Sequence, residues 1–325
     1  MTTPTFRMAL AHCDRHIPLF EGRVGQRGAT LVTVPVGQSV AYHGERGRHT
    51  RMITQREWDA AEVSLSSYLV AKDRGSDLTA IPVIPRRLFS QGLLFVRSDS
   101  SVEHPRDLEG QRVGIASYQT TLSVLAKGDL AAEHGVAWTS ITWVTNHPEA
   151  LDVELPAEVA VESAPDGRDI VDLLLEGDVA AVVMPHPPRS LIGTGSPVRQ
   201  LFTDAREAEL DYYRRQGYWP IMHMVAIRPE TAQAHPELPR ALYAAFEEAN
   251  ALIEEAYLDP NWSLLAWAPS YVNAEREAFG GNPWRNGVRA NEANLRRFMA
   301  YSREQGLTRR ELAMEELFHP SVLDT

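Results

Sequence analysis

The chain has 325 residues, of which 44% are hydrophobic and 23% charged, and this is typical of a globular protein with two domains of ordinary size. A formal net charge of −11 disfavours nucleic acid and anionic membrane as partners, because both bind basic surfaces. Because Cys13 is the single cysteine, an internal disulfide and a cysteine-rich zinc site are excluded.

The amino-terminal sequence lacks the basic segment followed by an apolar segment that marks a secretory signal. No apolar run approaches the roughly 18 residues that a membrane-spanning helix needs. We therefore expect a cytoplasmic protein with neither nucleic-acid nor membrane partners. The sequence leaves a homo-oligomer open.

Apolar stretches of strand length alternate with helical patterns along most of the chain. The first expected strands are residues 6–12, 29–36, 58–63, 78–83 and 93–96, with a turn over residues 84–87. Further strands are expected at residues 112–116, 141–145, 159–162, 179–184 and 221–227. Helices are expected near residues 66–73, after 121, over 170–178 and 203–216, and from 236 onward with a break at 279–287. The polar residues 41–52 predict a helix interrupted by a mobile loop.

Alternating strands and helices imply an α/β fold whose mostly parallel sheets are covered on both faces. The pattern predicts two lobes, because the chain leaves the first near residue 97 and returns near residue 221. Residues 1–97 and 221–325 form the discontinuous first lobe with the C-terminal helices, and residues 98–220 form the second. Ligands of such folds bind at the carboxyl ends of strands, so we expect the lobes to close over a small anion in a central cleft.

A strand-to-helix junction in the first lobe carries Glu62 and the serines Ser64, Ser66 and Ser67. Hydroxyls and the N–H groups of a helix start suit a carboxylate, although serine is also an ordinary helix cap. Glu62 is either a general acid or base in a dry environment or the partner of an arginine.

Arg86 and Arg87 lie in the turn after the next strand. Arginine binds a carboxylate through two parallel hydrogen bonds, so the pair is a candidate anion site, although paired arginines in a turn are commonly just solvated. In the second lobe Tyr118, Gln119, Thr120 and Thr121 offer hydroxyls and an amide at another helix start. We expect polar groups on both walls of the cleft.

His223 lies in an apolar strand at the second crossing between the lobes. It is either a core residue or a proton donor, because imidazole titrates near neutral pH. Asp14, after the first strand, is a candidate base. Histidines flank Asp14, but their spacing does not make a metal site without a helix and further ligands, so no metal is expected. The sequence has no phosphate-binding loop, dinucleotide glycine motif or nucleophile elbow.

Taken in order, five motifs resemble the 4,5-dihydroxyphthalate decarboxylase family. They are AAEVSLSSYL, AIPVIPRRLF, LEGQRVGIASYQTT, LDYYRRQGYWPIMHMVAIRP and YSREQGLTRRELAMEELFHP, and together they span nearly the whole chain. The resemblance implies a type II periplasmic-binding-protein-like fold with two lobes. It also implies non-oxidative decarboxylation of a hydroxylated aromatic acid without an organic cofactor.

The chain departs from the family pattern at three places. Ser90 and Gln91 follow Phe89 where the pattern has an Arg-His pair, and His186 stands where an arginine is expected. The loop over residues 41–51 is about ten residues longer than usual and carries the basic residues His43, Arg46, Arg48, His49 and Arg51. This loop is either a solvated surface loop or a lid that returns positive charge to the site.

The leading hypothesis is a carboxy-lyase that acts on a hydroxylated aromatic (di)carboxylic acid resembling 4,5-dihydroxyphthalate. We expect His223 to donate a proton, Glu62 or Asp14 to act as base, and His186 to face the substrate. We expect the arginines and serines of the first lobe to bind carboxylates while residues 118–121 close from the second. The alternatives are a non-catalytic solute-binding protein for a small carboxylate and a biosynthetic enzyme of another reaction type on the same fold.

Overall fold

The computed structural model describes residues 4–25, 28–37, 47–165, 168–191 and 193–325. The chain divides into two compact units. Unit 1 comprises Met1–Arg87, Ile221–Leu295 and Leu312–Thr325, and unit 2 comprises Leu88–Pro220 and Arg296–Glu311. No helix in the described part of the chain is both long and apolar enough to cross a membrane.

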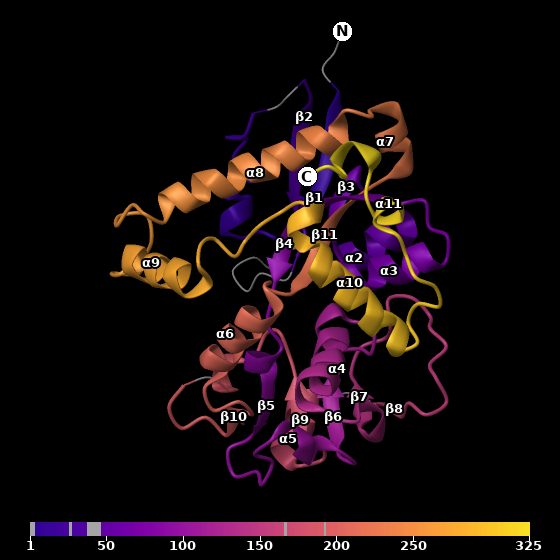
Figure 1. The fold of residues 1–325 in the computed structure, drawn as a ribbon, viewed down its shortest axis with the longest axis vertical. Coiled ribbons are helices and arrows are strands. Elements are labelled where there is room, and N and C mark those ends of the chain that lie inside the picture. The colour runs from indigo at the N-terminus through magenta and orange to yellow at the C-terminus, as the bar shows by residue number, and fades with distance from the viewer. Residues whose placement is uncertain (1–3, 26–27, 38–46, 166–167, 192) are drawn as a thin grey trace. The chain divides into compact units, whose positions relative to one another are not determined.

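The sheet of unit 1 has five strands in the order β2-β1-β3-β11-β4 (Figure 1). Its strands are β1 (Thr5–Leu10), β2 (Thr30–Pro35), β3 (Ala60–Ser64), β4 (Thr79–Arg87) and β11 (Ile221–Ile227). β1 runs parallel to β2 and β3, whereas β11 lies antiparallel between β3 and β4. All seven residues of β11 are buried, as expected for a central strand whose sequence is a continuous apolar run around one histidine.

Strand β4 extends further than its sequence predicts. The predicted turn at residues 84–87 is wrong, because β4 continues through Pro85 to Arg87. Proline lacks the N–H that a central strand needs, but β4 is an edge strand and its pairing with β11 shifts register twice, where proline is tolerated. The extension places Arg86 beside His223 in the ladder.

Helices accompany this sheet, and four of those given next carry proline in the first turn, where its missing N–H is not needed. They are α1 (Ile17–Phe20), α2 (Arg48–Thr50), α3 (Leu65–Asp73), α7 (Pro229–Ala234), α8 (Leu238–Ala256), α9 (Ala268–Phe279) and α11 (Met314–Leu317). Ser64 caps α3 by accepting a hydrogen bond from the N–H of Ser67 at 3.5 Å. A π-helical turn, Arg51–Gln55, follows α2 directly. α10 (Val288–Glu304) begins in unit 1 and ends in unit 2.

The sheet of unit 2 has six strands in the order β10-β5-β9-β6-β7-β8. Its strands are β5 (Leu94–Arg97), β6 (Arg112–Ile115), β7 (Thr142–Thr145), β8 (Val161–Ser163), β9 (Ala181–Val183) and β10 (Val198–Gln200), and its helices include α4 (Thr121–His134), α5 (Ile170–Glu176) and α6 (Ala205–Gln216). The predicted lobe boundary at residue 97 differs from this division, because β5 pairs with β9 and β10 inside unit 2. Segment Arg296–Glu311, expected in the first lobe, also belongs to unit 2.

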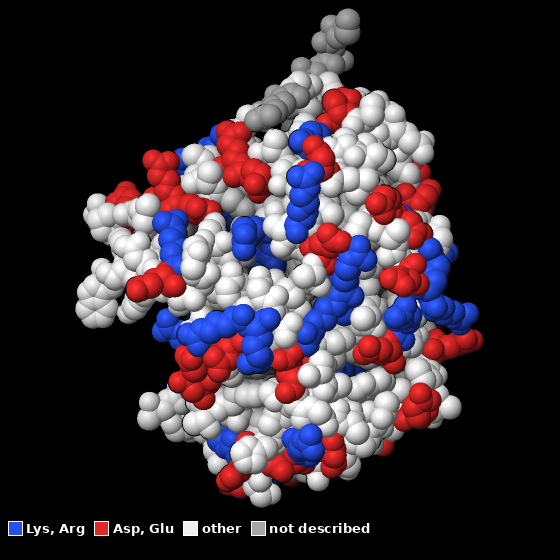
Figure 2. Space-filling model, viewed as in Figure 1, with Lys and Arg blue, Asp and Glu red and all other residues white. Residues whose placement is uncertain are grey.

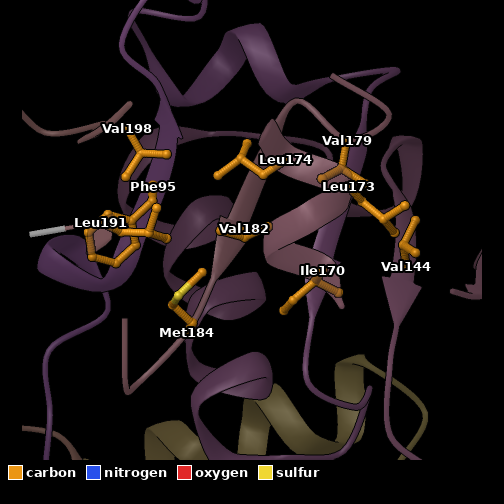
Figure 3. Close-up of a cluster of buried hydrophobic side chains, with 10 residues drawn as sticks. All are labelled: Phe95, Val144, Ile170, Leu173, Leu174, Val179, Val182, Met184, Leu191 and Val198. Atoms are coloured by element: carbon orange, nitrogen blue, oxygen red, sulfur yellow. The ribbon is translucent and has the colours of Figure 1, made fainter. Parts of the chain in front are cut away.

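The core of unit 2 forms where α5 packs against the sheet (Figure 3). Ile170, Leu173 and Leu174 lie on one face of α5 because helical residues three and four apart are neighbours. Gly114 of β6 permits this close packing, since a Cβ there would lie 2.9 Å from Val182 and 3.0 Å from Ile170. The resulting cluster consists of Phe95, Val144, Ile170, Leu173, Leu174, Val179, Val182, Met184, Leu191 and Val198.

Candidate active site

The carboxylate of Glu62 is the centre of a buried charged cluster in unit 1. Its side chain is 1% exposed. Oε1 lies 2.7 Å from a guanidinium nitrogen of Arg48 and 2.5 Å from Nδ1 of His223, and Oε2 accepts a hydrogen bond from the N–H of Ala11 at 2.9 Å. Burial alone would raise the pKa of Glu62, but Arg48 and the hydrogen bond from His223 hold it well below its ordinary value. Glu62 is therefore an anion at neutral pH.

The imidazole of His223 is held by Glu62. Burial lowers the pKa of His223 to about 4, and the cations of Arg86 and Arg48 act in the same direction while Glu62 opposes them. At neutral pH the ring is uncharged, so its Nδ1–H donates to Glu62 and Nε2 carries the lone pair. Glu62 thus sets both the orientation and the tautomer of His223.

Arg48 comes from the long basic segment and is only 2% exposed. Besides its ion pair with Glu62, it donates to the carbonyl of Val36 at 2.8 Å. Gly37 makes room for the guanidinium, because a Cβ there would lie 2.7 Å from Arg48 Nη1 and 2.9 Å from the backbone of Ala11. Arg48 is accordingly the built-in counter-ion of Glu62.

His49 follows Arg48 and places a second imidazole beside the first. The ring centroids of His49 and His223 are 4.5 Å apart, with an angle of 58° between the planes. Burial, Arg48 and His223 hold the pKa of His49 well below its ordinary value, so this ring is also uncharged. Its buried Nδ1 has no hydrogen-bond partner among the described residues.

Arg86 supplies a further cation to the cluster. In the sheet, His223 on β11 pairs with Arg86 on β4 and, on its other side, with Ser64 on β3. The three polar residues therefore form one row across neighbouring strands. Burial lowers the pKa of Arg86, Glu62 opposes this, and Arg48 and Arg15 add to it. The guanidinium therefore lies within electrostatic reach of each of these groups.

Arg15, in the short 3-10 helix Asp14–His16, reaches the end of β4. Its Nε donates to the carbonyl of Pro85 at 2.5 Å, and its guanidinium carbon lies 4.5 Å above the ring of Trp284. Asp14 contacts Arg15 at 3.2 Å and accepts a hydrogen bond from the hydroxyl of Tyr257 at 2.6 Å. Burial would raise the pKa of Asp14, but these two contacts bring it below its ordinary value.

The remaining predicted residues of unit 1 support the fold around this cluster. Ser66 and Ser67 are buried in the first turn of α3, and Ser64 caps that helix. Arg87 donates to the carbonyl of Arg285 at 2.5 Å and to the side chain of Asn291 at 2.6 Å. Ser64 and Arg87 are therefore engaged in contacts that stabilise the fold. Of the two predicted arginines, Arg86 is the better placed to bind an anion.

The predicted turn of unit 2 is held by its own contacts. Glu149 accepts the N–H groups of Tyr118 and Gln119 at 2.6 and 3.0 Å. Lys127 is fully buried, lies 3.0 Å from the centroid of the Tyr118 ring and donates to the Tyr118 carbonyl. Thr120 lies just before α4 and is hydrogen-bonded to Ser123 at 2.6 Å, and the next residue, Thr121, is buried.

The departures from the family pattern fall into different environments. Ser90 is buried and donates to Asp129 at 2.6 Å, while His186 is exposed. Arg51 forms an ion pair with Glu57. The basic residues His43 and Arg46 lie outside the described residues, so the predicted lid is described only from Gly47 onward.

Sequence reasoning did not assign a site role to Arg15, and it treated Arg48 and His49 only as parts of a basic loop. The available signal was that Arg48 and His49 lie just before Met52 and Ile53, two apolar residues that are buried. Burial raises the pKa of the Cys13 thiol to about 12, which disfavours the thiolate that a nucleophile would need. Among the described residues no group of histidine, cysteine, aspartate and glutamate side chains could hold a metal ion.

Comparison with known proteins gives one relative that matches over nearly the full length and another that matches about half of this chain, although no protein-family model matches. The 4,5-dihydroxyphthalate decarboxylase of Comamonas testosteroni is 33% identical over 328 aligned positions, which cover 98% of this chain and 97% of the relative. The 4,5-dihydroxyphthalate decarboxylase of Pseudomonas putida is 34% identical over 175 positions, which cover 52% of this chain and 68% of the relative.

Solved structures with the same fold are more distant in sequence. The periplasmic aliphatic sulphonate binding protein SsuA from Escherichia coli matches all of this chain with a TM-score of 0.59 and 13% identity. A mutant of the desulfurization enzyme DSZB in complex with biphenyl-2-sulfinic acid matches 99% of this chain and 98% of its own, with a TM-score of 0.56 and 15% identity. These likenesses confirm the predicted two-lobed, type II periplasmic-binding-protein-like α/β fold.

Proposed function

The chain belongs to the 4,5-dihydroxyphthalate decarboxylase family, and we propose that it removes CO2 from a hydroxylated aromatic dicarboxylate without a cofactor. The observation that carries the proposal is the pair of uncharged imidazoles, His223 and His49, set beside Arg86 and anchored by the buried Glu62–Arg48 ion pair. This arrangement offers proton transfer and anion binding in one place.

The chemical difficulty is the electron pair left on the ring carbon when CO2 departs. A hydroxyl para to the carboxylate solves it, because removal of the phenolic proton pushes electrons into the ring while the ring carbon takes up another proton. The carbon–carbon bond then breaks, CO2 leaves and the ring regains its aromaticity. The net reaction consumes one proton, and since the two proton transfers occur at opposite ends of the ring, they require two groups.

His223 is the proposed donor to the ring carbon. Its pKa of about 4 keeps it neutral in the resting protein, but a bound dianion favours the imidazolium form, so the ring takes up a proton with the substrate. Glu62 stabilises that imidazolium through Nδ1. Glu62 itself is too acidic and too fully hydrogen-bonded to act as the base, and we assign it to positioning.

His49 is the proposed base for the phenolic hydroxyl. A neutral imidazole accepts a proton readily, and it returns this proton to the phenolate after CO2 has left. The substrate carboxylates are assigned to Arg86 and Arg15, which approach the site from β4 and from the segment after β1. Two guanidinium groups match the two carboxylates of a phthalate.

The test is a turnover assay with 4,5-dihydroxyphthalate, in which released CO2 and the product 3,4-dihydroxybenzoate are measured together. His223→Gln and His49→Gln should each lower kcat by about 100-fold or more, as expected for loss of a general acid or base. The matched control is His147→Gln, which changes an exposed histidine and should leave kcat unchanged.

Two results would contradict the proposal. Tight binding of the dicarboxylate without release of CO2 would identify a solute-binding protein. Binding is also the function named for the structural neighbour SsuA. Turnover that is undiminished in both histidine variants would assign the proton transfers to other groups.

A further inference from the structure

A projecting arm of unit 1 exposes an unusual amount of apolar surface. The arm consists of the loop after α8 and of helix α9, which lies beyond the end of α8 in Figure 1. Six large apolar side chains of the arm are exposed, and we call them the arm patch: Leu258 (45%), Trp262 (39%), Leu264 (107%), Leu265 (56%), Trp267 (67%) and Tyr271 (55%). They are six of the eight exposed large hydrophobic residues among the described residues.

Helix α9 is only slightly covered by the rest of the described chain. Of its 12 residues only Ala268 is buried. An isolated helix of this length is marginal in water, because helices in proteins are stabilised mainly by packing of an apolar face. The apolar face here includes Trp267 and Tyr271, which are one turn apart and both exposed. A further protein surface that packs against this apolar face would therefore stabilise the helix.

The arm is nevertheless held in place at its base. The ring of Trp262 packs edge-on against Tyr257 at 4.7 Å, and Glu254 receives both Arg276, at 3.5 Å, and the side-chain amide of Asn282. These contacts fix the arm on the end of α8, so the patch is a surface in a defined orientation.

The size of the patch is close to what a stable dimer needs. At about 200 Å² for each side chain, the exposed fractions amount to roughly 700 Å². The largest apolar patch on a typical monomer is about 300–600 Å², and a stable interface buries about 800 Å² per partner. Two copies of the arm patch facing each other would bury roughly 1,400 Å² before any rim contacts are added.

The charges around the patch disfavour a lipid surface as the occupant. The flanking charged residues are Glu254, Glu255, Asp259, Glu275, Arg276 and Glu277, which are acidic with one exception, and the whole chain carries a net charge of −11. Interfacial helices that bind anionic lipid carry a basic polar face instead. Figure 2 shows mostly uncharged surface at the left edge, where α9 lies, with charged side chains around it. An apolar centre with a charged rim is the anatomy of a protein interface.

We propose that the arm patch is the interface of a homodimer, in which the patch of one copy packs against the same patch of a second copy. Closed two-fold symmetry is the commonest arrangement of soluble oligomers, and it needs only one self-complementary surface. Leu264 and Trp267 are the most exposed of the six side chains, and tryptophan is enriched among the residues that dominate binding at interfaces. Acidic rim groups remain hydrated and are screened by salt.

The test is sedimentation velocity over a range of protein concentrations, applied to the full chain and to the double variant Leu264→Glu/Trp267→Glu. The wild-type protein should be dimeric at micromolar concentration. The double variant brings four carboxylates to the two-fold interface and should weaken the dimer by about 100-fold or more, as expected when central interface residues are lost. The matched control is Leu175→Glu, a change of an exposed leucine (39%) on α5 of unit 2, and it should remain dimeric.

A covalent measurement keeps the test decisive if the double variant fails to fold. Ala266 is exposed within the arm, and Ala266→Cys should form a disulfide-linked dimer on mild oxidation. A wild-type protein that stays monomeric at the highest concentration reached, a double variant that is still dimeric, or the absence of the disulfide link in Ala266→Cys would each overturn the proposal. Binding of wild-type monomer to phosphatidylcholine–phosphatidylserine vesicles would assign the arm patch to lipid instead.

Discussion

Replacement of Arg48 by methionine tests the buried ion pair on which the proposed site depends. Methionine preserves the bulk of the side chain but leaves the Glu62 carboxylate, 1% exposed, without its cation. Removing one partner of a buried pair costs about 3–5 kcal/mol, because the other charge stays buried and uncompensated. We expect Arg48→Met to lower the free energy of unfolding of unit 1 by about that amount at pH 8. Turnover should also fall, because His223 loses a fully ionised partner.

The pH dependence follows from the same pair. In the wild type the pKa of Glu62 is depressed, so its stabilisation is present above pH 4.5, its ordinary unfolded value, and is lost only at lower pH. Without Arg48, burial becomes the dominant influence and raises the pKa of Glu62. The variant then loses stability as the pH rises through the raised value. The difference between wild type and variant should therefore be larger at pH 8 than at pH 5.

Urea unfolding of four proteins completes the test: wild type, Arg48→Met, Glu62→Gln and the double variant. The double variant should recover at least about 2 kcal/mol relative to Arg48→Met, because it buries no unpaired charge. A loss below about 1 kcal/mol in Arg48→Met, or no recovery in the double variant, would refute the assignment of Arg48 as the counter-ion of Glu62.

Three further predictions concern neighbouring groups. Arg86→Ala should weaken dicarboxylate binding by about 30-fold or more in calorimetry, since loss of a charge partner costs about 2–5 kcal/mol. Arg87→Ala should instead lower the free energy of unfolding by about 1–3 kcal/mol, because two oxygen acceptors lose their donor. Unchanged affinity in Arg86→Ala would contradict the anion assignment. Burial lowers the pKa of His16 to about 4, so the buried neutral ring contributes about 3 kcal/mol to the free energy of unfolding above pH 6.5. This contribution is lost as the pH falls to 4. Urea unfolding should show the loss, and His16→Gln should reduce it. Burial raises the pKa of Asp129 from 3.8 to about 7, so the contribution of this one group to stability falls as the pH rises between those two values. Asp129→Asn should therefore gain stability relative to the wild type across that range, and a difference between the two proteins that does not change with pH would contradict the assignment.

Much of the fold could be predicted from periodicity and turn residues. The strand at residues 221–227 is confirmed with the same bounds, and the first two strands are confirmed within two residues, because each is an apolar run closed by polar or turn residues. The error at residues 84–87 has a definite cause. Proline and arginine indicate a turn locally, whereas the edge position of β4 makes both acceptable in a strand.

The boundary between the two units was harder to predict than the strands. Residues 94–97 read as the last strand of the first lobe because they follow its other strands in sequence. Their place in the second sheet depends on hydrogen bonds with β9 and β10, which lie more than 80 residues later in the chain. A non-local pairing of this kind leaves no local signal.

The cluster around Glu62 could be predicted only in part, for the same reason. The strand-end glutamate and the strand histidine were identified from their chemistry and position, and the sheet register brings them together. The polar residues 41–52 predict a helix interrupted by a mobile loop, and Arg48 and His49 do lie in a short helix, but nothing in this pattern indicates that the two side chains reach the site. Their burial follows from the carboxylate and the imidazole that they meet, which are 14 and 174 residues away in sequence.

The electrostatic arrangement also explains why such a site is built around an ion pair that contributes little net stability. A buried pair seldom stabilises a protein more than well-packed apolar residues would. Here it fixes an anion against His223 while Arg86 and Arg15 remain as the cations nearest the proposed substrate position. The resting imidazoles stay neutral because burial opposes their protonation, and the surrounding guanidinium groups add to this effect. An incoming dianion reverses that balance, so protonation of His223 becomes coupled to binding of a molecule whose charge matches the arginines. Selectivity for a dicarboxylate and activation of the proton donor would then arise from the same charges.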